Sequence, residues 1–150
     1  MAIFQTNFAD GRKTLPVPYC QGAVMAAVIH AEILQAFTAA SDIFELCQWP
    51  AEAKLIGATL IAANTTGAVT ADIGIMDGTP GDDEDDTRAL TSDLIFDGTN
   101  VADGQENEAA VADCIAIASA KTHRALGMTL SANQAAAAGK TISVLVRYTY

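Results

Sequence analysis

Basic side chains are scarce in this 150-residue chain, which contains 8 Lys and Arg residues against 18 Asp and Glu residues. The net charge is −10 at pH 7, and Arg12 and Lys13 are the one adjacent basic pair. A protein that binds nucleic acid needs a stripe of basic side chains to neutralise a row of phosphates, whereas an acidic surface repels DNA. The sequence therefore predicts no nucleic-acid partner.

Cysteine is also sparse and shows no metal-binding or redox spacing. Cys20, Cys47 and Cys114 are odd in number, and no C-x-x-C occurs. We therefore expect reduced thiols that pack as small apolar side chains. The N-terminus lacks the pattern of a signal peptide, and no apolar run is long enough to span a bilayer. These absences predict no membrane partner and synthesis in the cytoplasm.

Motifs that carry catalysis or hold cofactors are missing as well. His30 and His123 do not form an H-E-x-x-H pattern, and neither G-x-S-x-G nor G-x-x-x-x-G-K-[ST] occurs. The acidic run 82–86 could chelate Ca²⁺, but it lacks the glycine of an EF-hand loop. We interpret it as a solvated loop extended by self-repulsion, with a cation site as the alternative. The sequence thus predicts a protein that is not an enzyme and has no cofactor or metal.

Large apolar side chains are few, although the hydrophobic fraction is 51%. Alanine accounts for 30 residues, while Ile, Leu, Val and Phe together account for 35. Each buried carbon unit stabilises the fold by only ~0.8 kcal/mol, so an alanine-rich core is thin. Packing against other subunits would offset this, which is a first indication of assembly.

Short runs of alternating residues, separated by turn residues, predict β-strands along most of the chain. The expected runs are 24–34, 43–49, 54–63, 68–76, 94–96, 114–118, 123–130 and 141–148. Such strands without a long amphipathic helix indicate an all-β fold, an antiparallel β-sandwich or a jelly-roll-like single domain. Residues 99–113 are ambiguous, and 106–113 could form one or two helical turns.

Turn residues also suggest which strands pair. Asn64-Thr65-Thr66-Gly67 predicts a hairpin over residues 54–76, and Asp97-Gly98 predicts another chain reversal. The last strand, 141–148, is expected to pair with 123–130.

Residues 1–21 predict an extended N-terminal arm, ahead of a sandwich domain over residues 22–150. Pro16 and Pro18 disfavour helix there, and the apolar residues show no clear periodicity. The arm is either a loosely packed terminus or a segment that docks on a neighbour.

Several segments resemble, in the same order, those of small virion proteins of tailed phages. The main one is a hairpin whose second strand reads Val69-Thr70-Ala71-Asp72-Ile73-Gly74-Ile75, followed by a Gly-rich loop. The accompanying segments are 41–46, Trp49-Pro50, 94–99, 124–128 and 139–148. The resemblance covers about residues 22–148 and is to head decoration (cement) or head-fibre-type structural proteins of tailed bacteriophages.

This resemblance implies a virion protein on the outer surface of the capsid, which binds the assembled head and bridges major capsid subunits. It also implies a homotrimer. We predict that the arm makes the capsid contact through Phe4, Phe8, Arg12 and Lys13. The alternative function is a receptor- or glycan-binding sandwich of a head fibre or tail. A single tryptophan, Trp49, and an aromatic content of 6% weaken that alternative.

Overall fold

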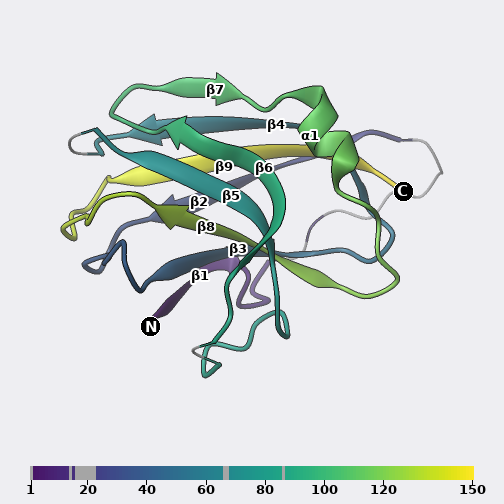
Figure 1. Cartoon of the computed structure of the whole chain (residues 1–150), viewed down its shortest axis with the longest axis horizontal. Coiled ribbons are helices and arrows are strands. Elements are labelled where there is room, and N and C mark those ends of the chain that lie inside the picture. The colour runs from purple at the N-terminus through teal and green to yellow at the C-terminus, as the bar shows by residue number, and fades with distance from the viewer. Residues whose placement is uncertain (1, 14, 16–22, 66–67, 86) are drawn as a thin grey trace.

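The computed structural model describes residues 2–13, 15, 23–65, 68–85 and 87–150, and its regular structure is almost entirely β (Figure 1). The strands and the single helix of these residues are β1 Ile3–Phe8, β2 Met25–Glu32, β3 Ile43–Trp49, β4 Lys54–Ala63, β5 Thr70–Met76, β6 Leu90–Asn100, β7 Glu106–Glu108, α1 Val111–Ala116, β8 Arg124–Leu130 and β9 Thr141–Thr149. The predicted all-β sandwich is confirmed.

The strands form two sheets that pack face to face. The five-stranded sheet, sheet A, has the order β1-β3-β8-β5-β6, and the four-stranded sheet, sheet B, has the order β2-β9-β4-β7. Every pairing is antiparallel except that of β1 with β3, which is parallel. This arrangement leaves β1 and β6 at the ends of one sheet and β2 and β7 at the ends of the other.

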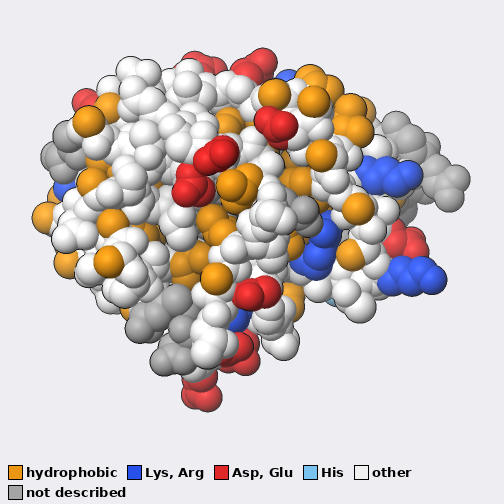
Figure 2. Space-filling model, viewed as in Figure 1, with side chains coloured by type: hydrophobic (Ala, Val, Ile, Leu, Met, Phe, Trp, Pro, Cys, Tyr) orange, Lys and Arg blue, Asp and Glu red, His pale blue; other side chains and the backbone are white. Residues whose placement is uncertain are grey.

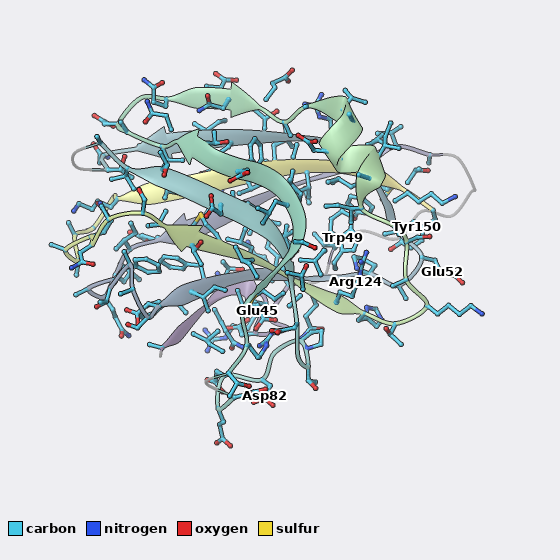
Figure 3. All side chains as sticks on the ribbon, viewed as in Figure 1. Glu45, Trp49, Glu52, Asp82, Arg124 and Tyr150 are labelled. Carbon is cyan, nitrogen blue, oxygen red and sulfur yellow. The ribbon has the colours of Figure 1, made fainter. Side chains whose placement is uncertain are left out.

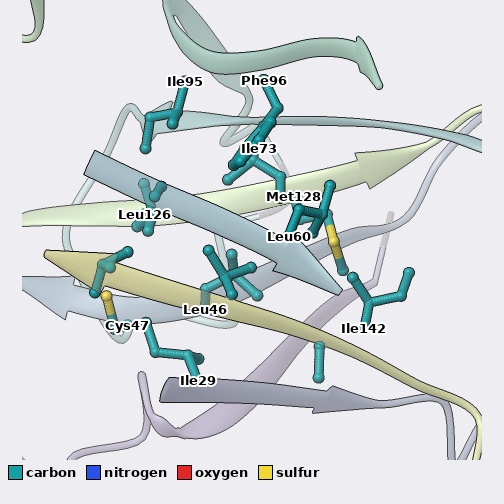
Figure 4. Close-up of a cluster of buried hydrophobic side chains, with 14 of the residues drawn as sticks. Ile29, Leu46, Cys47, Leu60, Ile73, Ile95, Phe96, Leu126, Met128 and Ile142 are labelled. Atoms are coloured by element: carbon teal, nitrogen blue, oxygen red, sulfur yellow. The ribbon is translucent and has the colours of Figure 1, made fainter. Parts of the chain in front are cut away.

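The main core lies between the sheets, where alternating side chains point inward (Figure 4). In β9, Ile142, Val144, Val146 and Tyr148 are fully buried, as their period-two spacing predicts. The alternation predicted for residues 24–34 is confirmed too, since the odd-numbered residues from Ala27 to Ile33 are buried. Burial of a large apolar side chain contributes about 1.5–3 kcal/mol, so these rows provide most of the stabilisation.

Both predicted strand pairings are wrong. β4 lies in sheet B and β5 in sheet A, so residues 54–76 are not a hairpin. β9 pairs with β2 and β4, whereas β8 pairs with β3 and β5. The chain crosses between the sheets after Asn64, which has a φ of 58°, and the Thr65 hydroxyl donates to the Val101 carbonyl at 2.6 Å. Turn residues specify a reversal of direction, but not which sheet the next strand joins.

The Asp97-Gly98 turn is also wrong, because β6 runs through it. Gly98 has a φ of +55°, and its N–H donates to the Asp72 carboxylate at 2.7 Å. The register between β5 and β6 shifts between Ala71 and Ile73. The glycine therefore serves a bulge inside a long strand rather than a turn.

The region around Cys114 forms a helix rather than the expected strand. Helix α1 buries Cys114 and packs against β4 and β6. Residues 106–113 divide between β7 and the start of this helix. No helix in the described part of the chain is long and apolar enough to cross a bilayer.

Part of the predicted N-terminal arm belongs to the sandwich. Strand β1 pairs with β3, with Ile3 opposite Ile43 and Phe4 opposite Phe44. The Thr6 hydroxyl donates to the Leu46 carbonyl, which fastens the strand to its neighbour. The predicted boundary between residues 21 and 22 lies outside the described residues.

Candidate functional site

The two aromatic residues predicted to contact the capsid face their own chain. The Phe4 ring lies 6.1 Å from that of Phe37 and 5.3 Å from that of Phe44, centroid to centroid. Phe4 and Phe8 are both partly buried and pack against the main core. Their side chains therefore hold β1 in place.

The two basic residues of the predicted contact are exposed, just after β1. The Arg12 Nε lies 3.0 Å from the Asp10 carboxylate, and the Arg12 side chain is 78% exposed. The Lys13 ammonium lies 5.9 Å from the centroid of the Phe8 ring. Of the four predicted contact residues, the structure thus brings Phe8 and Lys13 together and leaves both cations accessible at one turn.

A buried ion pair joins β3 to the long loop between β5 and β6. The Arg88 Nη1 lies 2.8 Å from the Glu45 carboxylate, and both side chains are completely inaccessible to solvent. Glu45 also accepts hydrogen bonds from the Gly81 N–H at 2.8 Å and the Gln5 amide at 3.3 Å. Breaking such a pair by removing one partner leaves an uncompensated buried charge.

Arg88 organises the loop of residues 77–89, which we call the 77–89 loop. Its guanidinium donates to the carbonyls of Asp77 at 3.1 Å and Asp82 at 2.6 Å. Gly78 has a φ of +76°, and a Cβ there would lie 2.7 Å from the Arg88 Cγ. The glycine is therefore required both by its backbone conformation and by the close approach of Arg88.

Sequence reasoning missed this pair, although one signal pointed to it. Glu45 interrupts an apolar strand at a position where a charged residue is rarely buried without a partner. The strand predicted at 43–49 is confirmed, and four of the five residues from Ile43 to Cys47 are apolar. A carboxylate buried within such a strand requires a cation as its partner, but no pattern in the sequence indicates that Arg88 is that cation.

Residues 82–85 of the acidic run project from the body of the molecule on the 77–89 loop (Figures 2 and 3). Asp82 accepts hydrogen bonds from the N–H groups of Glu84 and Asp85 at 3.1 and 3.3 Å. Hydrogen bonds from the Thr87 hydroxyl and N–H lower the pKa of Asp85. In the described residues, no group of three or more His, Cys, Asp or Glu could hold a metal ion, and Asp86 lies outside them.

Cys47, Cys114 and His30 occupy positions that suit structural roles. Burial, followed by the nearby Glu45 charge, strongly raises the pKa of the Cys47 thiol. Burial also raises the pKa of Cys114. Thiols of this kind stay protonated at neutral pH and are poor nucleophiles. His30 shares a hydrogen bond of 2.8 Å with the Ser143 hydroxyl on the neighbouring strand.

Trp49 is 2% exposed and packs edge-on against Tyr148, with ring centroids 5.2 Å apart. A buried ring cannot stack on a sugar. Trp49 therefore gives no support to the glycan-binding alternative.

Five of the six exposed large apolar side chains of the described residues lie in two places, and the sixth, Ile61, lies on β4. Val24, Val28 and Leu34 lie on β2 or next to its ends, and Val111 and Ile115 lie on α1, where hydrophobic atoms show in Figure 2. A cleft of about 540 Å³ lies between β1 and β2 and is lined mainly by residues of these strands and the segment after β2. Large contiguous apolar patches mark surfaces that contact other molecules, whereas single exposed apolar side chains are common on protein surfaces.

Comparison with known proteins shows that the chain resembles proteins of phage capsids. No protein-family model matches the sequence, and no curated protein matches it either. A chain of the solved capsid of Ralstonia phage GP4 shares 33% identity with a TM-score of 0.87, over 99% of this chain and 97% of that chain. A chain of the capsid asymmetric unit of cyanophage Pam1 matches at 18% identity and a TM-score of 0.52, over 93% of this chain and 94% of that chain, and shows the fold alone. The chain therefore belongs to the same family as the GP4 capsid chain and is a phage virion structural protein.

Proposed function

We propose that this chain is a decoration (cement) protein that binds the outer surface of the assembled head and bridges neighbouring major capsid subunits. The observation that carries the proposal is the net charge of −10 on a member of a capsid family. The inner face of a filled head lies against packaged DNA, which repels an acidic protein. The outer face carries no such penalty.

The mechanism is mechanical reinforcement. A protein that binds the assembled shell better than free subunits shifts the equilibrium toward the shell. We propose a homotrimer, as the resemblance implies, because three linked copies engage several capsid sites at high effective concentration. Contacts that are individually weak then hold the shell against the outward pressure of its DNA.

We propose Arg12 and Lys13 as the capsid contact, with Phe4 and Phe8 holding the strand that presents them. Support comes from their exposure at one turn and from the acidic character of the rest of the chain. Deletion of the whole arm would remove β1 and part of the core, so it cannot test the contact. The sharper change is Arg12→Glu with Lys13→Glu.

The first experiment removes the gene for this chain and examines the heads. We expect heads to assemble and fill, but to break at lower temperature, and purified protein added back should rebind and restore their stability. A complete absence of heads would mean that the chain builds the shell itself. Binding to a glycan array without binding to heads would favour the receptor-binding alternative.

The second experiment measures binding of variants to heads that lack the protein. Arg12→Glu/Lys13→Glu should weaken binding at least about tenfold, because the substitutions replace both cations of the proposed interface with acidic side chains. Lys54→Glu/Lys121→Glu is the matched control, because it makes the same change in net charge at two exposed lysines elsewhere. Equal loss in both variants would show a general charge effect and remove the proposed contact, while leaving the cement function itself in place.

A further inference from the structure

Aspartate followed directly by glycine is a pair prone to spontaneous isomerisation, and the chain contains it four times. The pairs are Asp10-Gly11, Asp77-Gly78, Asp97-Gly98 and Asp103-Gly104. Glycine has no side chain to hinder attack of its backbone nitrogen on the preceding carboxyl group, and it gives the backbone the freedom that ring closure needs. Both residues of every pair are exposed, so access of water does not separate the four pairs.

In two of the pairs, the reacting nitrogen is held in a hydrogen bond to another strand. The Gly98 N–H donates to the Asp72 carboxylate on β5 at 2.7 Å. The Gly104 N–H donates to the Ala62 carbonyl on β4 at 3.1 Å. Ring closure requires that this bond break first, so these two pairs react only when the structure opens locally.

In a third pair, Asp77-Gly78, the aspartate is held on all sides by the other end of its loop. The Asp77 N–H donates to the Ala89 carbonyl at 3.0 Å, and the Asp77 carboxylate accepts from the Ala89 N–H at 2.6 Å. The Asp77 carbonyl accepts from the Arg88 Nε at 3.1 Å. The Arg88 side chain also packs closely over Gly78. The carboxyl group and the peptide that must meet are therefore both restrained.

The fourth pair, Asp10-Gly11, is held by its own turn. The Asp10 N–H donates to the Thr6 carbonyl at 3.0 Å, and the Asp10 carboxylate accepts from the Arg12 N–H at 3.0 Å and lies 3.0 Å from the Arg12 Nε. Among the described residues, the Gly11 N–H has no hydrogen-bond acceptor, and no atom lies within 4 Å of where a Gly11 Cβ would be. The attacking nitrogen is thus free, and the bond to the Arg12 N–H bends the carboxyl group back toward it.

We propose that Asp10 is a site of spontaneous isomerisation, and that it reacts before the other three aspartates in the folded protein. The Gly11 nitrogen attacks the Cγ of the protonated Asp10 carboxyl group, a C–N bond forms, and one molecule of water leaves, which closes a succinimide ring. Water then adds to the former main-chain carbonyl of Asp10, and the C–N bond at that carbon breaks. The isoaspartyl product contains the same atoms as before, but its backbone runs through the former side chain and is one carbon longer.

Isomerisation repositions the cations of the proposed capsid contact, and this consequence rests on the proposed function. The free carboxylate of the product derives from the main-chain carbonyl of Asp10, so it no longer lies where it pairs with Arg12. The longer backbone also shifts Arg12 and Lys13 relative to β1. A stored preparation therefore accumulates molecules that bind heads less tightly.

Peptide mapping of purified protein stored in warm, neutral buffer tests the site. Chromatography with electron-transfer fragmentation identifies isoaspartyl peptides, whose mass is unchanged. We expect isomerisation of Asp10 to be at least about tenfold faster than that of Asp77, Asp97 or Asp103, because those three react only from locally opened states. In urea the four rates should converge. Equal rates in the folded protein, or a faster rate at another pair, would overturn the proposal. A difference that persists in urea would also overturn it, because the fold would then not select the site.

The variant Asp10→Glu tests the consequence for binding, with Asp103→Glu as its matched control. Glutamate keeps the charge, but its longer side chain closes a ring far less readily. Storage should weaken head binding of the wild type and of Asp103→Glu, and should leave that of Asp10→Glu unchanged. Equal loss in all three would contradict a role for Asp10 in the loss. Isomerisation of Asp10 without any loss of binding would support the modification site but remove Arg12 and Lys13 as the capsid contact.

Discussion

The two sheets differ in how their side chains are buried or exposed. In sheet A, Glu45 is buried against Arg88 of the 77–89 loop, and Ile3 and Leu90 pack against a second small apolar cluster of Ile43, Met76 and Ala125. Sheet B instead leaves alternate residues of β2 exposed, among them Ala26 and Val28. The same alanine-rich chain thus buries part of sheet A against its own loop, which we call the sealed face, and leaves the open face, at β2, available for contact. We infer that the sealed face supplies stability and that the open face supplies assembly.

The largest expected effect comes from breaking the sealed face at Glu45. Glu45→Gln leaves the Arg88 guanidinium buried without a counter-charge and should lower the free energy of unfolding by about 3–5 kcal/mol. Urea unfolding followed by circular dichroism measures the change. The double variant Glu45→Leu/Arg88→Met should recover much of the loss, because no charge remains buried. A double variant as unstable as Glu45→Gln would show that the damage is one of packing.

A smaller effect is expected at Gly78, beneath the same arginine. Gly78→Ala should cost about 1–3 kcal/mol more than Gly104→Ala, because only the first introduces a Cβ that meets Arg88. The control is closely matched, since Gly104 has a φ of +75° and open space around it. Thermal unfolding of both variants measures the difference. Equal losses would mean that Arg88 moves aside at no cost.

A pH-dependent effect is expected at Asp42, which ties the start of β1 to the turn before β3. Burial tends to raise its pKa, but hydrogen bonds from Thr38, Ser41 and Ala2 outweigh this and hold the pKa below its ordinary value of 3.8. The carboxylate therefore contributes stability above about pH 4, and this is lost as the pH falls through the lowered pKa.

Asp42→Asn should thus destabilise the protein by ~0.5–1 kcal/mol at pH 6, and by less at pH 3. Urea midpoints at the two pH values provide the measurement. A gap between variant and wild type that widens at pH 3 would contradict the direction of the shift.

The smallest effect on stability is expected on the open face. Val28→Thr should change the free energy of unfolding by no more than about 0.5 kcal/mol, since the side chain is exposed and threonine suits a strand. A large loss of stability in the isolated chain would show that the open face also supports the fold.

Local pattern was enough to predict most strands but not their partners. The alternation in residues 141–148 identified β9 and its buried face, because period-two spacing is a property of the strand itself. The pairing of β4 with β5 was wrong because a turn reverses the chain without choosing a sheet. The strand predicted around Ile115 was wrong because small alternating residues also suit a short helix, and packing of Cys114 decides between them.

The placement of the predicted contact residues also depends partly on local properties and partly on long-range packing. Exposure of Arg12 and Lys13 follows from their charge, which is costly to bury. The inward placement of Phe4 depends on Phe37 and Phe44, which lie on distant segments of the chain. Pairing of residues 3–8 with β3 is likewise a long-range event, and a segment without clear periodicity gives little sign of it.

The sequence by itself determined the β-rich class, the acidic surface and the alanine-rich core, because composition and alternation act over neighbouring residues. The tertiary structure alone decided that Glu45 meets Arg88, that β4 and β5 part into different sheets, and that β2 has a free edge. Each of these depends on residues far apart in the chain, and it is the packing of the whole sandwich that brings them together or keeps them apart.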